Sequence, residues 1–170
     1  SLKDLLDLAS VGRAEQNEAV DLNAVIKQVC ADLEVVISTK NARIETDVLP
    51  VIHGVPLQMH QLFYNLINNA LKFSADGRVP SIKLTWQETT YQEARYQEIV
   101  VSDNGIGFDQ AYAEKIFQMF QRLHTRDAYS GTGIGLALCK KVVENHGGII
   151  FAKSGKGVGA HFHILLPVAT

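Results

Sequence analysis

The sequence predicts an α/β (α+β) two-layer sandwich, with a mixed sheet of about five strands packed on three helices. Long stretches with apolar residues at helical spacing are interspersed with short runs of β-type residues, and several of these runs follow one another in hairpin order. The chain has 170 residues, of which 46% are hydrophobic. This is enough for the core of one domain, so we expect one folded unit.

The first part of the chain predicts one truncated helix and one complete helix. Residues 2–9 place leucines at helical spacing, and we interpret them as the end of a helix whose beginning lies upstream. Residues 13–20 are polar and aperiodic, which indicates a linker. Asp21 then precedes apolar residues that continue at helical spacing as far as Ile37. This pattern predicts a helix of about five turns.

The next segments predict two short strands and a long helix. Extended runs occupy residues 43–48 and 50–55. Pro56 opens a helix, because its fixed φ suits the first turn. This helix ends near Phe73, since the residues at 74–77 favour a turn.

The second half of the chain predicts four strands and a helix, together with a long loop. The strands are expected at residues 81–88, 97–102, 149–153 and 160–166. From Asp103 to Gly135 only one helix is predicted, near residues 111–120, so the length of this segment indicates a functional loop. A further helix runs from Ile134 to His146 and ends at two glycines. Residues 155–159 form a glycine-rich turn between the last two strands.

Composition excludes several classes of function. The formal net charge is −2 and the pI is about 6.3, which argues against nucleic acid as a partner. No apolar run reaches the roughly 20 residues that span a bilayer, and no signal peptide is evident. Cys30 and Cys139 lack the spacing of a metal site and are predicted to be core thiols. We expect a cytoplasmic domain, whose parent protein is either anchored in a membrane or soluble.

A polar stripe on the helix that begins at Pro56 is the most informative feature. Gln61, Asn65, Asn69 and Lys72 fall on one side of this helix, whereas its other positions are mostly apolar. Asparagine is a mediocre helix former. Its carbonyl oxygen suits a magnesium ion that remains bound to phosphates, and a lysine can reach the same phosphates. The alternative is an ordinary solvated helix face.

Two glycine-rich segments predict a nucleotide site. Asp103-Asn104-Gly105-Ile106-Gly107 directly follows an apolar strand, and its carboxylate could accept a hydrogen bond from the amino group of a flat base. A hairpin turn is the alternative. Gly131-Thr132-Gly133-Ile134-Gly135-Leu136 opens a helix, where backbone amides favour phosphate. A flexible hinge is the alternative there. Neither a GxGxxG fingerprint nor a GxxxxGK[ST] loop is present.

Other candidates have simpler explanations. His161 and His163 share one face of a strand, but no third ligand accompanies them, so a surface pair is preferred to a metal site. His146 lies in the last turn of a helix, where it can satisfy free carbonyl groups. Phe117 and Phe120 are predicted to be packing anchors.

Taken together and in order, these motifs resemble the Bergerat-type ATP-binding domain of sensor histidine kinases, over about residues 20–167. The matching segments are the asparagine box (65–73), the first glycine box (103–107), the phenylalanine box (116–122), the second glycine box (131–135), the Glu144–Gly148 segment and the last glycine turn (155–159). The resemblance implies that Mg²⁺ and ATP bind between the helical layer and a mobile lid, here about residues 108–130. Residues 21–170 would form this catalytic domain.

The resemblance also assigns roles to individual residues. Asn65 would ligate magnesium, Asn69 and Lys72 would contact the phosphates, and Arg122 would steady the γ-phosphate during transfer. Asp103 would bind the adenine amino group. The remaining positions of the implied nucleotide site are Phe73, Gly105, Gly107, Phe108, Gly131, Thr132, Gly133, Gly135 and Leu136. Of these, Gly133 and Gly135 would provide the hinge of the lid.

The implied activity is transfer of the γ-phosphate of ATP to a histidine on a separate dimerisation domain. Residues 1–12 would be the end of that domain, the parent would be a homodimer, and a response regulator receiver domain would take the phosphate. Gln61 stands where hydrolysing relatives have a glutamate that activates water, so hydrolysis is disfavoured. The isolated chain would not phosphorylate itself. A nucleotide-sensing or partner-binding module of the same fold, and a serine kinase that binds a transcription factor, are the alternatives.

Overall fold

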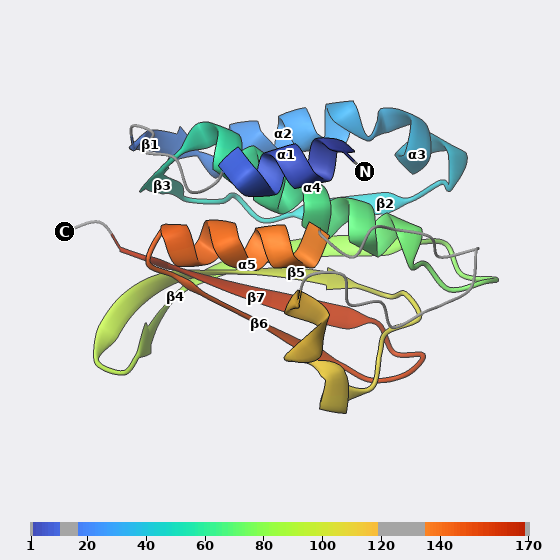
Figure 1. The fold of residues 1–170 in the computed structure, drawn as a ribbon. Coiled ribbons are helices and arrows are strands. Elements are labelled where there is room, and N and C mark those ends of the chain that lie inside the picture. The colour runs from blue at the N-terminus through green and yellow to red at the C-terminus, as the bar shows by residue number, and fades with distance from the viewer. Residues whose placement is uncertain (1, 11–16, 119–134, 169–170) are drawn as a thin grey trace.

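The computed structural model describes residues 2–10, 17–118 and 135–168. Its main sheet has five strands in the order β2-β4-β5-β7-β6, and Figure 1 shows them beneath a layer of helices. The strands are β2 (Arg43–Thr46), β4 (Ser81–Tyr91), β5 (Ala94–Asp103), β6 (Ile149–Ser154) and β7 (Ala160–Pro167). β2 pairs with β4 in parallel, whereas the other neighbours are antiparallel. The predicted two-layer sandwich with a mixed sheet is therefore confirmed.

The helices lie on one face of this sheet (Figure 1). They are α1 (Leu2–Ser10), α2 (Leu22–Asp32), α3 (Glu34–Thr39), α4 (Pro56–Lys72) and α5 (Gly135–Asn145). α4 packs against both α2 and α5. Apolar side chains from α2, α4, α5 and the inner face of the strands form one core. No helix in the described ranges is long and apolar enough to cross a membrane.

The helix predicted from Asp21 to Ile37 is divided in two. Asp21 caps the start of α2 as expected, because its side chain accepts a hydrogen bond from the Asn23 N–H. Helical geometry is interrupted at Leu33, which has φ −101° and ψ 12° and whose side chain is buried. The β-branched residues that follow at 35–37 lower helix propensity. The continuation is therefore the separate six-residue helix α3.

Two further segments differ from their predictions. Residues 18–20 were assigned to a linker, but Glu18–Asp21 form strand β1, which pairs antiparallel with β3 (Val51–Gly54). The helix predicted near residues 111–120 is instead a pair of short 3₁₀ turns, Gln110–Tyr112 and Lys115–Phe117. Asp109 caps the first turn by accepting from the Ala111 N–H. In both cases tertiary contacts decide the local structure, because neither segment has a strong periodicity of its own.

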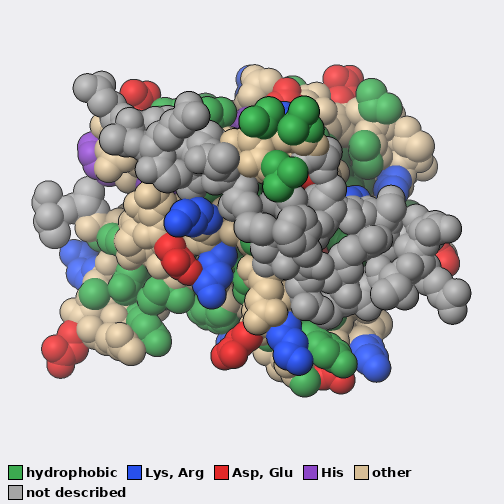
Figure 2. Space-filling model, viewed as in Figure 1, with side chains coloured by type: hydrophobic (Ala, Val, Ile, Leu, Met, Phe, Trp, Pro, Cys, Tyr) green, Lys and Arg blue, Asp and Glu red, His purple; other side chains and the backbone are tan. Residues whose placement is uncertain are grey.

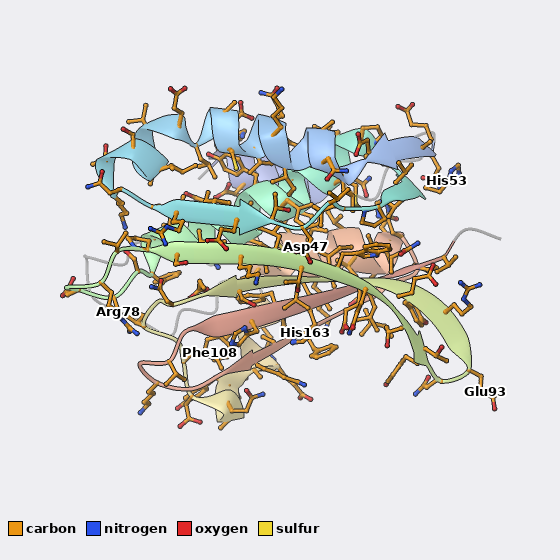
Figure 3. All side chains as sticks on the ribbon, turned by 180° about the vertical axis from the view of Figure 1, so that it is seen from behind. Asp47, His53, Arg78, Glu93, Phe108 and His163 are labelled. Atoms are coloured by element: carbon orange, nitrogen blue, oxygen red, sulfur yellow. The ribbon has the colours of Figure 1, made fainter. Side chains whose placement is uncertain are left out.

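The β4–β5 hairpin is longer than predicted. It closes through Gln92 and Glu93, whose φ values are 50° and 66°. Two-residue hairpin turns with positive φ usually contain asparagine or glycine, so the sequence carried no signal for this turn. The tip at Glu93 projects away from the loops near Arg78 and Phe108, which lie toward the opposite end of the sheet (Figure 3).

On the face drawn in Figure 2, basic and acidic side chains of the coloured residues are intermixed rather than separated by sign.

Candidate functional site

Asp103 is the last residue of β5, and one of its carboxylate oxygens accepts hydrogen bonds from the surrounding backbone. Its Oδ1 accepts hydrogen bonds from the N–H groups of Gly105 at 2.8 Å and Ala160 at 3.3 Å. Burial raises the pKa of Asp103 above its ordinary value, and the two backbone hydrogen bonds and nearby His161 partly offset this rise. No described group donates to Oδ2. Among the described residues, this second oxygen is therefore available to accept a hydrogen bond from a ligand.

Glycines allow three segments to meet beside Asp103. A Cβ atom on Gly105 would collide with the carbonyl oxygen of Phe73, and one on Gly107 would collide with the carbonyl of Gly155. A Cβ on Gly159 would likewise strike the carbonyl of Asp103. The predicted glycine box thus packs directly against the end of α4 and the last glycine turn. Only glycine permits such close approach of backbones.

Hydrogen bonds fix this three-way junction. The Ile106 N–H donates to the Phe73 carbonyl at 3.0 Å, and the Gly157 N–H donates to the Ile106 carbonyl at 2.7 Å. The guanidinium of Arg78 donates to the carbonyl groups of Gly105 at 3.4 Å and Gly157 at 3.1 Å. Figure 3 shows Arg78 at this end of the molecule. The sequence analysis missed Arg78, because it acts on backbone atoms and belongs to no motif.

Asn104 is a second supporting residue that the motif did not identify. Its Oδ1 accepts from the Ser81 N–H at 2.8 Å, and its Nδ2 donates to the Val79 carbonyl at 3.0 Å. The side chain therefore fastens the glycine box to the start of β4. Because both amide atoms are occupied by backbone groups, Asn104 is a structural neighbour of the site.

The polar stripe of α4 faces the beginning of α5. Asn65, Asn69 and Lys72 are each half-buried. The Nδ2 of Asn65 donates to the Gln61 carbonyl at 2.7 Å, and its Oδ1 would lie 2.9 Å from a Cβ atom placed on Gly135. The side chain of Asn69 forms no hydrogen bond with the described residues. The structure therefore brings one of the two predicted asparagines, Asn65, to the first described residue of α5.

Gln61 is buried, unlike the other members of the stripe. Its side chain is 8% exposed, and its Oε1 has no hydrogen-bond partner in the part of the chain that the structure describes. A buried unpaired carbonyl is uncommon and unfavourable. Neighbouring elements therefore cover α4 at this end of the polar stripe.

The first part of the segment predicted to be a lid is anchored to the sheet. The Phe108 N–H donates to Ser154 Oγ at 2.9 Å, and the Gln110 side chain bonds to backbone groups of Ala152 and Ser154 in β6. Phe117 is buried and packs edge-on against Phe162 at 6.1 Å, which confirms its role as a packing anchor. Residues 108–118 of the predicted lid segment thus contact β6, β7 and α5.

Several predicted site residues lie outside the described residues. They are Arg122, Gly131, Thr132 and Gly133, together with the proposed second anchor Phe120. Leu136, at the described start of α5, is half-buried and packs against the core.

The three histidines considered in the sequence analysis, His146, His161 and His163, have structural partners. His146 Nδ1 donates to the Val142 carbonyl at 2.7 Å, as predicted, and Nε2 accepts from the Val55 N–H at 3.1 Å. His163 lies 3.2 Å from Glu98 and stacks on Phe151, whereas His161 contacts Ser102. Within residues 2–10, 17–118 and 135–168, no group of three or more His, Cys, Asp or Glu side chains could hold a metal ion.

Residues 54–170 match the family described as histidine kinase-, DNA gyrase B-, and HSP90-like ATPase. The chain belongs to this ATPase family. The matched range contains the α4 stripe, Asp103, both glycine boxes and the last glycine turn, so the family match and the local geometry concern the same region. ATP binding is the activity that this family implies.

Solved structures of histidine kinases share the fold of this ATPase domain. The mycobacterial sensor histidine kinase MprB is 27% identical, with a TM-score of 0.73 over 89% of this chain and 97% of that chain. The catalytic domain of the histidine kinase ThkA is 28% identical, with a TM-score of 0.71 over 90% of this chain and 96% of that chain.

Curated relatives are longer proteins. Phytochrome-like protein Cph1 of Synechocystis sp. is 40% identical over 98% of this chain and 22% of its own length. Adaptive-response sensory kinase SasA of Prochlorococcus marinus AS9601 is 37% identical over 95% of this chain and 45% of its own length. The chain thus spans less than half of these relatives, and it corresponds to a histidine kinase ATPase domain.

Proposed function

We propose that this ATPase domain binds Mg²⁺-ATP and transfers the γ-phosphate to a histidine on a separate dimerisation domain of the same parent protein. A response regulator receiver domain would then accept the phosphate. The observation that carries the proposal is the carboxylate of Asp103, held in a junction of glycine loops near the end of the α4 stripe, whose Oδ2 has no donor among the described residues. The parent would be a homodimeric cytoplasmic or membrane-anchored sensor.

Asp103 would select adenine. Its Oδ1 is already occupied by two backbone donors, so Oδ2 is the oxygen that would accept from the exocyclic amino group. Guanine presents a carbonyl at the corresponding ring position, and this carbonyl would face the carboxylate without a proton between them. Gly105 and Gly107 would let the ring approach the backbone, while Phe73 and Phe108 would border it.

Asn65, Asn69 and Lys72 would bind the triphosphate and its ion. The sequence assigned magnesium to Asn65, but the contacts favour Asn69 as the direct ligand. Asn65 Oδ1 lies beside Gly135, at the described start of α5, where the helix dipole is positive and favours an anion over a cation. Asn69 lies one turn closer to Lys72, and its amide has no described partner. We therefore place the ion at Asn69 and a phosphate near Asn65 and Gly135.

Paired substitutions test this assignment. We expect wild-type affinity for ATP to rise when Mg²⁺ is added, and Asn69→Ala to lose most of this increase, on the order of tenfold. Asn65→Ala should weaken binding to a similar degree with and without the ion. Calorimetry in Mg²⁺ and in EDTA measures both effects. Asn68→Ala, on the same helix but outside the stripe, is the matched control.

The same titrations can overturn the assignment. If Asn65→Ala loses the magnesium effect and Asn69→Ala keeps it, the ion belongs to Asn65. If wild-type affinity is equal in Mg²⁺ and EDTA, neither asparagine is a metal ligand.

A further inference from the structure

Lys40 links α3 to the end of the helix that carries the polar stripe. α3 ends at Thr39, and Asn41 follows in the left-handed conformation, with φ 53°. Between them, the half-buried Lys40 extends its side chain to the C-terminus of α4. Its Nζ donates to the Leu71 carbonyl and, at 3.1 Å, to Ser74 Oγ. No motif in the sequence included Lys40.

The two acceptors of Lys40 flank the predicted nucleotide-binding residues Lys72 and Phe73. Two residues after Leu71, the Phe73 carbonyl accepts from the Ile106 N–H at 3.0 Å, and Gly105 lies against the same carbonyl. The end of α4 is thus bound by Lys40 on one side and by the glycine box on the other. Displacement of residues 71–74 would move the surface on which the glycine box rests.

The chemistry of this contact suits a fixed anchor. The last carbonyl groups of a helix lack intrahelical partners and carry partial negative charge. An ammonium group satisfies one of them with a charge-assisted hydrogen bond, which is stronger than a neutral one. Lys40 is half-buried, so water screens and replaces the contact less effectively than it would on an open surface.

We propose that Lys40 is a positioning residue for the nucleotide site, which acts by holding residues 71–74 against the glycine box. This inference rests on the proposed function, because it concerns the geometry of the same ATP pocket. Lys40 does not touch the nucleotide; it sets the location of the Phe73 carbonyl and hence of residues 105 and 106.

The test compares Lys40→Met, Lys40→Arg and Lys27→Met. Methionine keeps an unbranched chain and removes the donors, arginine keeps the charge and the donors, and exposed Lys27 on α2 is the control. We expect Lys40→Met to raise the dissociation constant for Mg²⁺-ATP about three- to tenfold. Lys40→Arg should recover most of the affinity, and Lys27→Met should match wild type.

Two further measurements separate positioning from general stability. In transfer assays, Lys40→Met should raise the KM for ATP while kcat at saturating ATP stays within about twofold of wild type. Hydrogen exchange in the absence of nucleotide should be faster at the Ile106 amide, whose acceptor is the Phe73 carbonyl, and unchanged in the core strands.

Each outcome has a distinct meaning. Wild-type affinity and exchange in Lys40→Met would overturn the inference while leaving the proposed function intact. A uniform increase in exchange throughout Lys40→Met, without recovery by arginine, would also overturn it, since Lys40 would then support the whole fold. Failure of the wild-type chain to bind ATP would overturn the proposed function, and the positioning role with it.

Discussion

Asp103→Asn is expected to lower the affinity for ATP at least tenfold and to leave the fold intact. The asparagine Oδ1 can still accept from the Gly105 and Ala160 N–H groups, so the junction of loops keeps its hydrogen bonds. The charged acceptor Oδ2, however, is replaced by an amide NH2 group, which is a donor and would face the adenine amino group. A hydrogen bond to a charged group is worth about 1.5–3 kcal/mol, which corresponds to roughly tenfold or more in affinity. Calorimetry with ATP measures the loss.

The raised pKa of Asp103 makes the unfolding free energy of the chain depend on pH. Burial favours the protonated carboxyl in the folded chain, so the folded state holds its proton to a higher pH than the unfolded state does. Between the ordinary value of 3.8 and the raised pKa, this group therefore lowers stability as the pH rises. Above that window, the unfolding free energy of Asp103→Asn should equal or exceed that of wild type.

Exposed Asp76→Asn is the control for removing one carboxylate from the chain. It should bind ATP like the wild type. A folded Asp103→Asn variant with unchanged affinity for ATP would remove Asp103 from the nucleotide site.

Gly107→Ala is expected to disrupt the site and to destabilise the chain much more than Gly77→Ala. Both glycines have positive φ, 63° at Gly107 and 76° at Gly77. Each alanine therefore incurs the cost of a left-handed conformation, about 1–2 kcal/mol. The two positions differ in their surroundings: a Cβ on Gly107 meets the Gly155 carbonyl, whereas a Cβ on Gly77 meets nothing within 4 Å.

Urea unfolding and ATP titration of both variants measure the difference. The free energy of unfolding of Gly107→Ala should be lower by about 3 kcal/mol or more, because the added atom strikes backbone that cannot rotate away. This variant should also lose ATP binding. Gly77→Ala should lose only the free energy that the left-handed conformation costs, and it should bind ATP normally. Equal losses of stability in the two variants would contradict the close packing of the glycine box on the last glycine turn.

The parts of the fold with strong periodicity could be predicted from the sequence. α4 and α5 bury one apolar side each, and the central strands alternate, so local pattern and tertiary packing favour the same structure. The break at Leu33 and the turn at Gln92–Glu93 could not be predicted in this way. At both places the backbone adopts a conformation that packing and strand pairing impose against weak or absent local preference.

The residues of the candidate site likewise differ in whether the sequence alone could identify them. Asp103, Asn65, Asn69 and the glycines could be proposed from the sequence because their residue types suit nucleotide and ion binding and occur in recognisable motifs. Lys40 and Arg78 were not identifiable, because each acts on the backbone of a segment distant in sequence. Their importance follows from which carbonyl groups they reach, and a single sequence contains no record of such contacts.

Phosphotransfer in trans tests the central claim most directly. The chain is incubated with γ-labelled ATP and Mg²⁺, alone and with a separate dimerisation domain of the parent that carries the helical histidine. We expect acid-labile, base-stable label on the added domain and none on the chain, because in-line transfer requires the acceptor nitrogen to dock near the γ-phosphate. Stoichiometric label on the isolated chain would contradict a separate acceptor. Absence of label on either component despite tight ATP binding would contradict the transfer function and favour a nucleotide-sensing module.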